Sequence, residues 1–353
     1  MDSNRKIEIN TSPHIHDNPS VASIMRNVVY ALLPVCAYAV YLFGISALAL
    51  LLVVTGSCLL TEMLYDRLLH RSGSLGDFST VITGLLLALT LPPGFPLWMG
   101  AVAGFIAIAL GKALFGGLGC NVFNPALVGR AFVQAAFPVA ITTWTPVRAT
   151  GRFLEFIPSS LAWPFLRPVD TTSWSQQLGI DGFTGATPLA LQKFQHIASS
   201  NSDLFLGLTA GSAGETSALL ILLCGAWLAL RKMMDWRISA GVFAGALLVS
   251  VPLHYGLDPQ VYPGPGFVLL SGGMMLGALF MATDVVGSPL TPRGVWLYGL
   301  LIGALTVIIR QFSALNEGIM YAILIANAVA PLIADVTQPR IYGAHKKRRR
   351  PAP

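Results

Sequence analysis

Residues 84–112 read GLLLALTLPPGFPLWMGAVAGFIAIALGK, which is a short apolar run, a break rich in proline and glycine, and then a glycine-rich apolar segment. Residues 274–310, MMLGALFMATDVVGSPLTPRGVWLYGLLIGALTVIIR, repeat that order. Paired short segments broken by proline or glycine are typical of membrane proteins built from inverted repeats. The two stretches therefore predict two related membrane halves. The alternative is the incidental self-similarity of any membrane sequence rich in Leu, Gly and Pro.

The composition also indicates a membrane protein. Of the 353 residues, 54% are hydrophobic and 11% are charged, whereas an average soluble domain has roughly 25% charged residues. The net charge is +6, and five positive charges stand in one run at residues 346–350. A basic tail beside a last apolar segment is first a signal of membrane orientation. We therefore expect one integral membrane domain in contact with lipids, and no nucleic-acid partner.

Ten apolar runs follow one another along the chain. Because about 17 to 25 apolar residues cross a bilayer core, they predict an all-α polytopic membrane protein of about ten transmembrane helices, arranged as two inverted five-helix repeats. The third, sixth and eighth runs are short for a full span. The expected helices cover residues 21–43, 45–65, 80–91, 97–115, 122–141, 217–230, 238–254, 267–282, 295–309 and 319–334.

The distribution of basic residues predicts the orientation. If the N-terminus is cytoplasmic, only Arg310 falls in a short outer connection, which is the positive-inside pattern. The polar start of the chain shows no cleavable signal peptide, so the first helix is expected to direct insertion into the bacterial inner membrane. The basic residues expected on the cytoplasmic side are Arg5, Lys6, Arg26, Arg67, Arg71, Lys112, Arg231, Lys232, Arg237, Arg293 and the tail.

This orientation divides the chain into five parts. Both termini are expected to be cytoplasmic, and the one long extracytoplasmic loop is expected in the periplasm. The parts are a cytoplasmic segment at 1–20, a first membrane half at 21–141, the periplasmic loop at 142–216, a second membrane half at 217–336 and a basic tail at 337–353.

The long loop contains the motif D-x-x-T-G-A-T, from Asp181 to Thr187. This is the acceptor pattern of periplasmic flavin transferases, which join FMN through its phosphate to the final threonine. A threonine hydroxyl can form a phosphoester, and Gly185 and Ala186 leave space for a modifying enzyme. We therefore expect covalent FMN on Thr187, with Asp181, Thr184, Gly185 and Ala186 completing the acceptor. The alternative is a simple turn before Pro188, since a residue before proline is restricted.

Specific strings along the whole chain resemble one family of membrane proteins. It includes the D subunit of the Rnf (Rsx) ion-translocating ferredoxin:NAD oxidoreductase and the B subunit of the sodium-translocating NADH:quinone oxidoreductase. One departure is PLIAD, which has an additional residue before Asp335 and puts a role for Asp335 in doubt. The strings are SPHIHDNPSVASIMRNVVYALLP from Ser12, TGLLLALTLPP from Thr83, NVFNPALVGRAF from Asn121, FMATDVVGSP from Phe280 and YAILIANAVAPLIADVTQPRIYG from Tyr321.

The resemblance implies a subunit of a translocase that couples electron transfer to ion movement and is not catalytic alone. It implies FMN on Thr187, a second, noncovalent riboflavin as a further expectation, and electron exchange with flavin and iron-sulfur subunits. Because redox chemistry belongs to the flavin, no side chain is expected to be catalytic. The sequence leaves open the position of the riboflavin, the choice of Na⁺ or H⁺, and the direction of electron flow.

Charged residues at membrane depth are functional candidates by default. Arg130, on a helix expected to begin at Asn124 and Pro125, could meet a flavin, a carboxylate or exposed carbonyls. Asp77 and Asp284 stand at matching breaks and could contribute to an ion path, or each could cap a helix or join a buried pair. Glu62 and Asp66 are expected to pair with Arg67 at the membrane surface.

Other cofactor chemistry finds little support in the sequence. The histidines form no facing pair on spanning helices, and no P-loop or Rossmann motif appears, so nucleotide binding is expected on partner subunits. No self-contained metal site is expected, although Cys120 could contribute to a shared one. Two other functions stay open, a solute channel or transporter and a scaffold protein without redox activity. Flavin content distinguishes both from a flavin-carrying protein.

Overall fold

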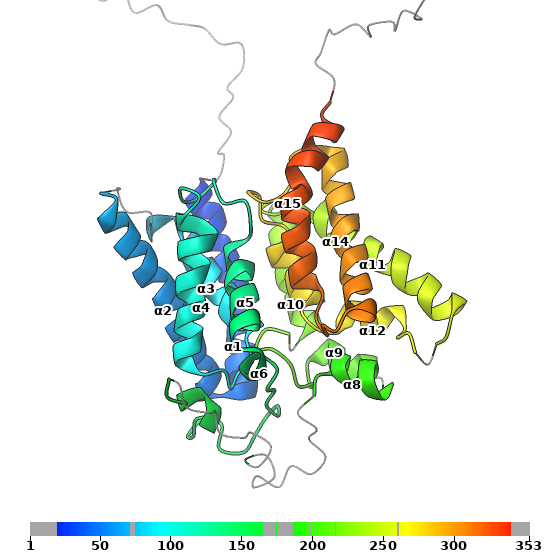
Figure 1. Cartoon of the computed structure of the whole chain (residues 1–353), viewed down its shortest axis with the longest axis horizontal. Helices are drawn as coiled ribbons and strands as arrows, with labels where there is room; N and C mark the ends of the chain where they lie inside the picture. Colours follow the sequence, from blue (N-terminus) through cyan, green and yellow to red (C-terminus); the bar gives the residue numbers. More distant parts are fainter. Residues whose placement is uncertain are drawn as a thin grey trace, which may run out of the picture.

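The structure is a computed structural model that describes residues 20–70, 75–164, 174, 186–197, 199–215, 217–259 and 261–339. All regular secondary structure in these residues is helical. Figure 1 shows two groups of helices side by side, the first in blue to green and the second in yellow to red. The predicted all-α class is confirmed for the described part of the chain.

The first group is centred on α2, which packs against α3 and α4, while α4 also packs against α5. Two short 3₁₀ turns, η1 (Leu75–Asp77) and η3 (Pro158–Leu161), lie in its connections. Its other elements are α1 (Val21–Phe43), α2 (Ile45–Leu68), α3 (Ser79–Thr90), α4 (Leu97–Ile108), the π-helical turn η2 (Ala109–Ala113), α5 (Pro125–Ala136) and α6 (Pro138–Ile141).

The second group repeats part of this packing, since α11 packs on α14 and α14 on α15. The inverted relation of the two halves stays a prediction. The elements are α8 (Pro188–Gln195), α9 (Asn201–Leu206), α10 (Ala218–Leu230), α11 (Trp236–Gly256), α12 (Pro265–Leu270), α13 (Met274–Leu276), the π-helical turn η4 (Gly277–Met281), α14 (Pro292–Phe312) and α15 (Ile319–Thr337).

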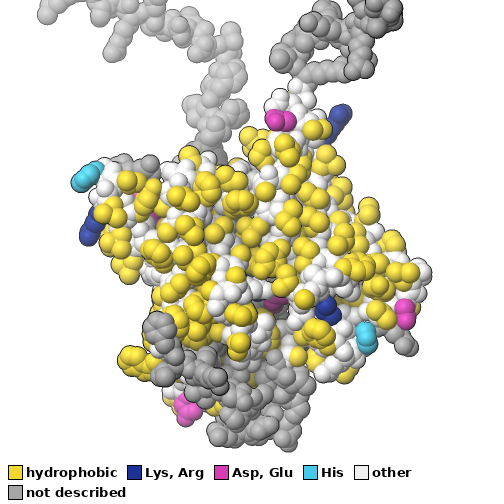
Figure 2. All heavy atoms as spheres, viewed as in Figure 1, with side chains coloured by type: hydrophobic (Ala, Val, Ile, Leu, Met, Phe, Trp, Pro, Cys, Tyr) yellow, Lys and Arg dark blue, Asp and Glu magenta, His cyan; other side chains and the backbone are white. Residues whose placement is uncertain are grey.

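Five of the described helices, α1, α2, α11, α14 and α15, are long and apolar enough to cross a membrane. Three shorter apolar helices lie at Ser79–Thr90, Leu97–Ala113 and Ala218–Leu230. Hydrophobic side chains cover most of the upper and middle part of the face drawn in Figure 2, whereas the visible charged side chains lie toward its edges and in its lower part. Such a surface suits lipid, and the count of ten crossings stays a prediction.

Two predicted helices are not continuous, and both corrections have local causes. The segment predicted at 122–141 starts at Pro125, where the Asn124 side chain caps Ala126 N at 3.1 Å, as its Asn-Pro pair indicated, but it breaks before Pro138. The segment predicted at 267–282 breaks after Leu270, where Gly272 has a φ of +61°. That backbone conformation favours glycine and interrupts a helix.

Glycines bring α11 and α14 into close backbone contact. A Cβ atom on Gly303 would lie 2.0 Å from the carbonyl oxygen of Val242, and one on Gly245 would lie 2.3 Å from that of Leu300. Small residues at helix crossings allow such an approach in membrane proteins. The contact holds the second group together where apolar burial against lipid provides little driving force.

The broken segments of each half are completed by the other half. Ala213 N and Gly214 N, in the connection before α10, donate to the carbonyls of Leu91 and Leu89 at 3.0 and 2.6 Å. Asn124 Nδ2 donates to Met281 O at 3.2 Å. These bonds satisfy carbonyl groups that a helix end leaves free.

The start of α1 and the end of α15 lie at the same end of the molecule, the upper end in Figure 1. We call it the terminal end. Helices α6, α8 and α9 lie at the other end, which we call the α8 end.

Candidate functional site

Thr187 is the N-cap of α8. Its Oγ1 accepts a hydrogen bond from Ala190 N at 3.2 Å, Pro188 occupies the first helical turn, and the residue is 5% exposed. Thr187 has the extended backbone conformation, with φ −75° and ψ 159°, that is expected of a residue before proline, and it starts a helix. Ala186 precedes it and is partly buried. Asp181, Thr184 and Gly185 lie outside the described residues.

Helix α8 is fixed to the end of α14 by Lys193. Its Nζ donates to the carbonyl oxygens of Arg310, Ser313 and Leu315 at 2.8, 2.5 and 3.0 Å. A cation at these carbonyls is also favoured by the helix dipole. Burial lowers the pKa of the Lys193 ammonium. The docked α8 places Thr187 against the interior of the protein.

Thr187 borders a small pocket of about 310 Å³ at the α8 end. Two carboxylate residues, Glu215 and Glu317, line it together with Gly272 at the break of the second group. The remaining lining residues are Pro188, Leu189, Leu204, Thr209, Ala210 and Gly211.

Arg130 forms a buried ion pair with Glu317, which stands between α14 and α15. The pair joins the first group of helices to the second. Among the possibilities that the sequence left open for Arg130, the structure selects a carboxylate partner. Its Nη1 and the Oε1 of Glu317 have no hydrogen-bond partner within the described residues. The pair therefore keeps free donor and acceptor capacity in the interior.

Two further charged residues complete this region. Arg310 donates from Nη1 to Val268 O at 2.9 Å and from Nη2 to Ser271 O at 3.1 Å, the carbonyls of the α12 break. Glu215 Oε2 accepts a long bond, 3.5 Å, from Ser212 N. Glu215 lies in the connection before α10, outside the spanning helices. Burial and the Glu317 carboxylate raise its pKa to about 7, although Arg130 opposes the shift.

We call Arg130, Glu215, Arg310 and Glu317 the charge cluster. The sequence singled out only Arg130, and the structure shows that its partners stand far along the chain. Glu215 and Glu317 could have been selected from the sequence as candidates, because carboxylates are rare in this chain and both stand next to apolar helices.

A larger pocket, of about 830 Å³, lies between the two groups toward the terminal end. Its wall is mainly apolar and carries a few polar side chains, as is typical of small-molecule sites. The polar residues that line it are Ser79, Thr83, Lys112, Asn121, Asn124, Thr283 and Asp284, and the apolar ones include Ile24, Met25, Val28, Ile82, Leu86, Phe280 and Val286.

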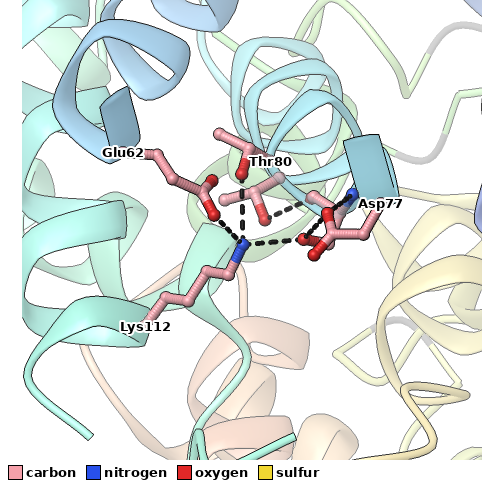
Figure 3. Close-up of polar contacts among 6 residues, drawn as sticks. Glu62, Asp77, Thr80 and Lys112 are labelled. Carbon is pink, nitrogen blue, oxygen red and sulfur yellow. Dashed lines mark hydrogen bonds and ion pairs between the residues drawn. The ribbon is translucent and has the colours of Figure 1, made fainter. Parts of the chain in front are cut away.

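Lys112, in the π-helical turn η2, is the buried cation of this pocket. Its Nζ donates to Glu62 Oε1 at 2.6 Å, Ser79 Oγ at 2.7 Å and Thr80 Oγ1 at 3.1 Å, as Figure 3 shows. Ser79 Oγ in turn donates to Asp77 at 2.7 Å. The predicted pairing of Glu62 with Arg67 was wrong, because the Glu62 side chain is buried and pairs with Lys112.

The two aspartates at the breaks both form local turn contacts. Asp284 accepts from Val286 N at 3.2 Å and Asp77 from Ser79 N at 2.9 Å. Asp284 also lines the larger pocket, so capping does not remove it from the functional candidates. Cys120 is exposed, and no group of three or more His, Cys, Asp or Glu that could hold a metal occurs in the described part.

Several apolar helices of membrane-spanning length, with buried charges and a pocket between two helix groups, are the features of a polytopic membrane protein. The chain belongs to the family described as NQR2, RnfD, RnfE, which it matches over residues 8–343.

Curated relatives cover nearly the whole chain. The chain is 37% identical to the D subunit of the proton-translocating ferredoxin:NAD(+) oxidoreductase complex of Clostridium ljungdahlii, over 96% of both chains. It is 39% identical to the D subunit of the Na(+)-translocating complex of Acetobacterium woodii, also over 96% of both chains. It is 40% identical to the D subunit of the ion-translocating oxidoreductase complex of Stutzerimonas stutzeri, over 93% of this chain and 94% of the relative.

Proposed function

We propose that this chain is the D-type membrane component of a complex that couples electron transfer between ferredoxin and NAD to ion translocation. Relatives named as such components match it over nearly its full length. The chain is not catalytic alone, and it works with flavin and iron-sulfur subunits of the complex. The relatives include a Na⁺ and a proton translocator, so membership of the family does not select the ion.

We propose that Thr187 carries FMN through a phosphoester, attached by a periplasmic flavin transferase. The D-x-x-T-G-A-T motif, which ends on the N-cap of α8 beside a small pocket, carries this proposal. The charged residues that line the pocket are Glu215 and Glu317. Two arginines stand next to its lining, Arg130 as the partner of Glu317 and Arg310 beside Gly272. Arg130 Nη1 and Arg310 Nε are buried N–H donors without a partner among the described residues, and these donors are the groups that could bind a phosphate. Helix N-termini also favour anions.

In this proposal the flavin supplies the electron-transfer chemistry when bound. Thr187 anchors it, and Lys193 keeps α8 docked on α14. Arg130 and Arg310 are buried cations next to the lining of this pocket, and they stand beside the Glu215 and Glu317 carboxylates. Thus the side chains position and balance charge, while none acts as the redox centre.

The larger pocket is our proposed site for the noncovalent riboflavin. It combines apolar walls with the amides of Asn121 and Asn124 and the Asp284 carboxyl group. A flat, uncharged ring system with polar edges suits such a lining. Lys112 and its partners would stand at the edge of this site.

We also propose the complete membrane arrangement that the sequence predicts, namely ten crossings as two inverted halves in the bacterial inner membrane. The terminal end would be cytoplasmic and the α8 end periplasmic. The five long and three shorter apolar helices support it, as does the common end of α1 and α15.

The test of the flavin anchor is in-gel fluorescence of the denatured protein, produced with its native transferase. We expect fluorescence in the wild type and its loss in Thr187→Val. Thr291→Val, at another Thr-Pro helix start, is the matched control and should stay fluorescent. A dark wild type, with verified transferase activity, would contradict the redox role and favour a transporter, for which the pocket between the two groups is the supporting observation.

A further inference from the structure

When both of its carboxylates are ionised, the charge cluster is balanced before any modification of Thr187. Arg130 and Arg310 each contribute one positive charge, since guanidinium groups do not lose their proton in proteins. Glu215 and Glu317 each contribute one negative charge when ionised. A phosphodiester on Thr187 would add one negative charge to the pocket that both carboxylates line.

We propose that Glu215 binds a proton when Thr187 carries its phosphodiester-linked flavin, which makes Glu215 a proton site beside the flavin anchor. The inference rests on the proposed function. The step is a protonation, in which the Glu215 carboxylate takes a proton from a hydronium ion of the solvent and leaves water. The added proton offsets the phosphodiester charge, so the net charge of the cluster is the same before and after flavin attachment.

The geometry explains why the proton binds to Glu215 and not to Glu317. Glu317 has a direct ion-pair partner in Arg130. Glu215 has a weaker contact, the 3.5 Å bond from Ser212 N. A carboxylate with fewer strong donors is the weaker acid.

The surroundings make an uncompensated charge costly. A Cβ on Gly273 would lie 3.0 Å from Glu215 Oε1, and one on Gly272 would lie 3.1 Å from Arg310 Nη2, so both charges flank the same backbone break. Charges interact more strongly in a buried site than in water. Burial and the Glu317 carboxylate already raise the pKa of Glu215 to about 7.

The charged groups that face Glu215 come from several elements. Arg130 projects from α5, Arg310 from α14 and Glu317 from the connection between α14 and α15. Lys193 of α8 is nearby in the fold, but its ammonium binds the carbonyls at the end of α14. Removing the Glu317 charge should therefore favour ionised Glu215.

The experiment uses the complete complex reconstituted in lipid and records infrared difference spectra during a pH titration. The signal is the C=O band of a protonated carboxylic acid, identified by its shift in ²H₂O. In the flavinylated wild type we expect a band whose midpoint lies above neutral pH. In Glu215→Gln that band should be absent, and in Asp203→Asn, an exposed carboxylate outside the cluster, it should be unchanged.

Two variants test the charge balance with Glu215 intact. Thr187→Val, which has no flavin charge, and Glu317→Gln should each lower the midpoint by about one pH unit or more, a tenfold change in proton affinity. If the Glu215→Gln variant fails to assemble into the complex, the midpoint shifts of these two variants still test whether Glu215 is the proton site. Equal midpoints in the wild type and Thr187→Val, or a band that persists in Glu215→Gln, would overturn the proposal.

Flavin fluorescence of the same samples separates the two hypotheses. A fluorescent wild type without the expected shift would reject the proton site alone. A wild type without flavin would reject the anchor and, with it, the inference about Glu215.

Discussion

At the scale of single residues, burial turns a charged side chain into a structural requirement. Arg130 and Glu317 have 4% and 11% exposed side chains, and each removes the cost of burying the other. Glu62 and Lys112 form a similar pair at the other pocket. In both cases the charged groups connect segments that are far apart in the sequence, so their loss affects the whole site.

We predict that Arg130→Met destabilises the protein by about 3–5 kcal/mol, because Glu317 is then a buried charge without its partner. Thermal unfolding of the purified protein in detergent would measure the loss. The double variant Arg130→Met, Glu317→Leu should recover much of the stability, since a buried pair replaced by apolar residues is often neutral. A double variant less stable than the single one would contradict this account.

At the scale of elements, helix ends decide how well the sequence predicts structure. The bounds of α1 were predicted correctly, since Ser20 caps its start and Gly44, with a φ of +74°, follows its end. For the segment at 122–141 the start at Asn124 and Pro125 was indicated, but its apolar composition conceals the break before Pro138. The apolar composition of a segment indicates that the segment is buried, whereas the caps and breaks of a helix depend on single residues.

The docking of α8 predicts an effect on flavin attachment. Because Thr187 is 5% exposed and caps α8, a transferase can reach its hydroxyl only when α8 is released. Lys193→Met removes the bonds to the end of α14 and should increase the initial rate of flavin attachment several-fold. The rate is measured by the appearance of in-gel fluorescence with purified transferase.

Lys232→Met is the control for that experiment, because Lys232 is an exposed lysine in the connection between α10 and α11, far from α8. It should leave the rate unchanged. An equal rate in Lys193→Met would mean that docking does not limit access to Thr187.

At the scale of the whole molecule, the two groups of helices share one continuous hydrophobic core and enclose the larger pocket between them. The charge cluster links the two groups of helices at the α8 end. Lys112 and its partners Glu62, Ser79 and Thr80 stand nearer the terminal end. The fold thus separates two polar sites along the membrane axis. An electron carrier at each of the two sites would provide a route for electrons from one side of the membrane toward the other.

The proposed orientation predicts opposite labelling of two reporter cysteines in intact cells. In a background with Cys120→Ser, Lys232→Cys lies at the terminal end and Asp203→Cys in α9 at the α8 end. A membrane-impermeant maleimide should label only Asp203→Cys, whereas both should react after lysis. Labelling of Lys232→Cys in intact cells would invert the proposed topology.

The sequence by itself determined the helical class, most apolar segments and the capped helix starts, and it contains the D-x-x-T-G-A-T motif on which the proposed flavin anchor rests. Each of these depends on neighbouring residues, through hydrophobic runs, capping side chains and proline or glycine at breaks. Family membership also followed from local strings along the chain, and the match over residues 8–343 confirmed it.

Only the tertiary structure decided which distant groups meet. Arg130 pairs with a carboxylate 187 positions away, and Glu62 selects Lys112 rather than the nearby Arg67. A buried charge requires a partner, but local sequence does not say which one, because that choice depends on how separate helices pack. The position of Glu215 beside Thr187 arises in the same way.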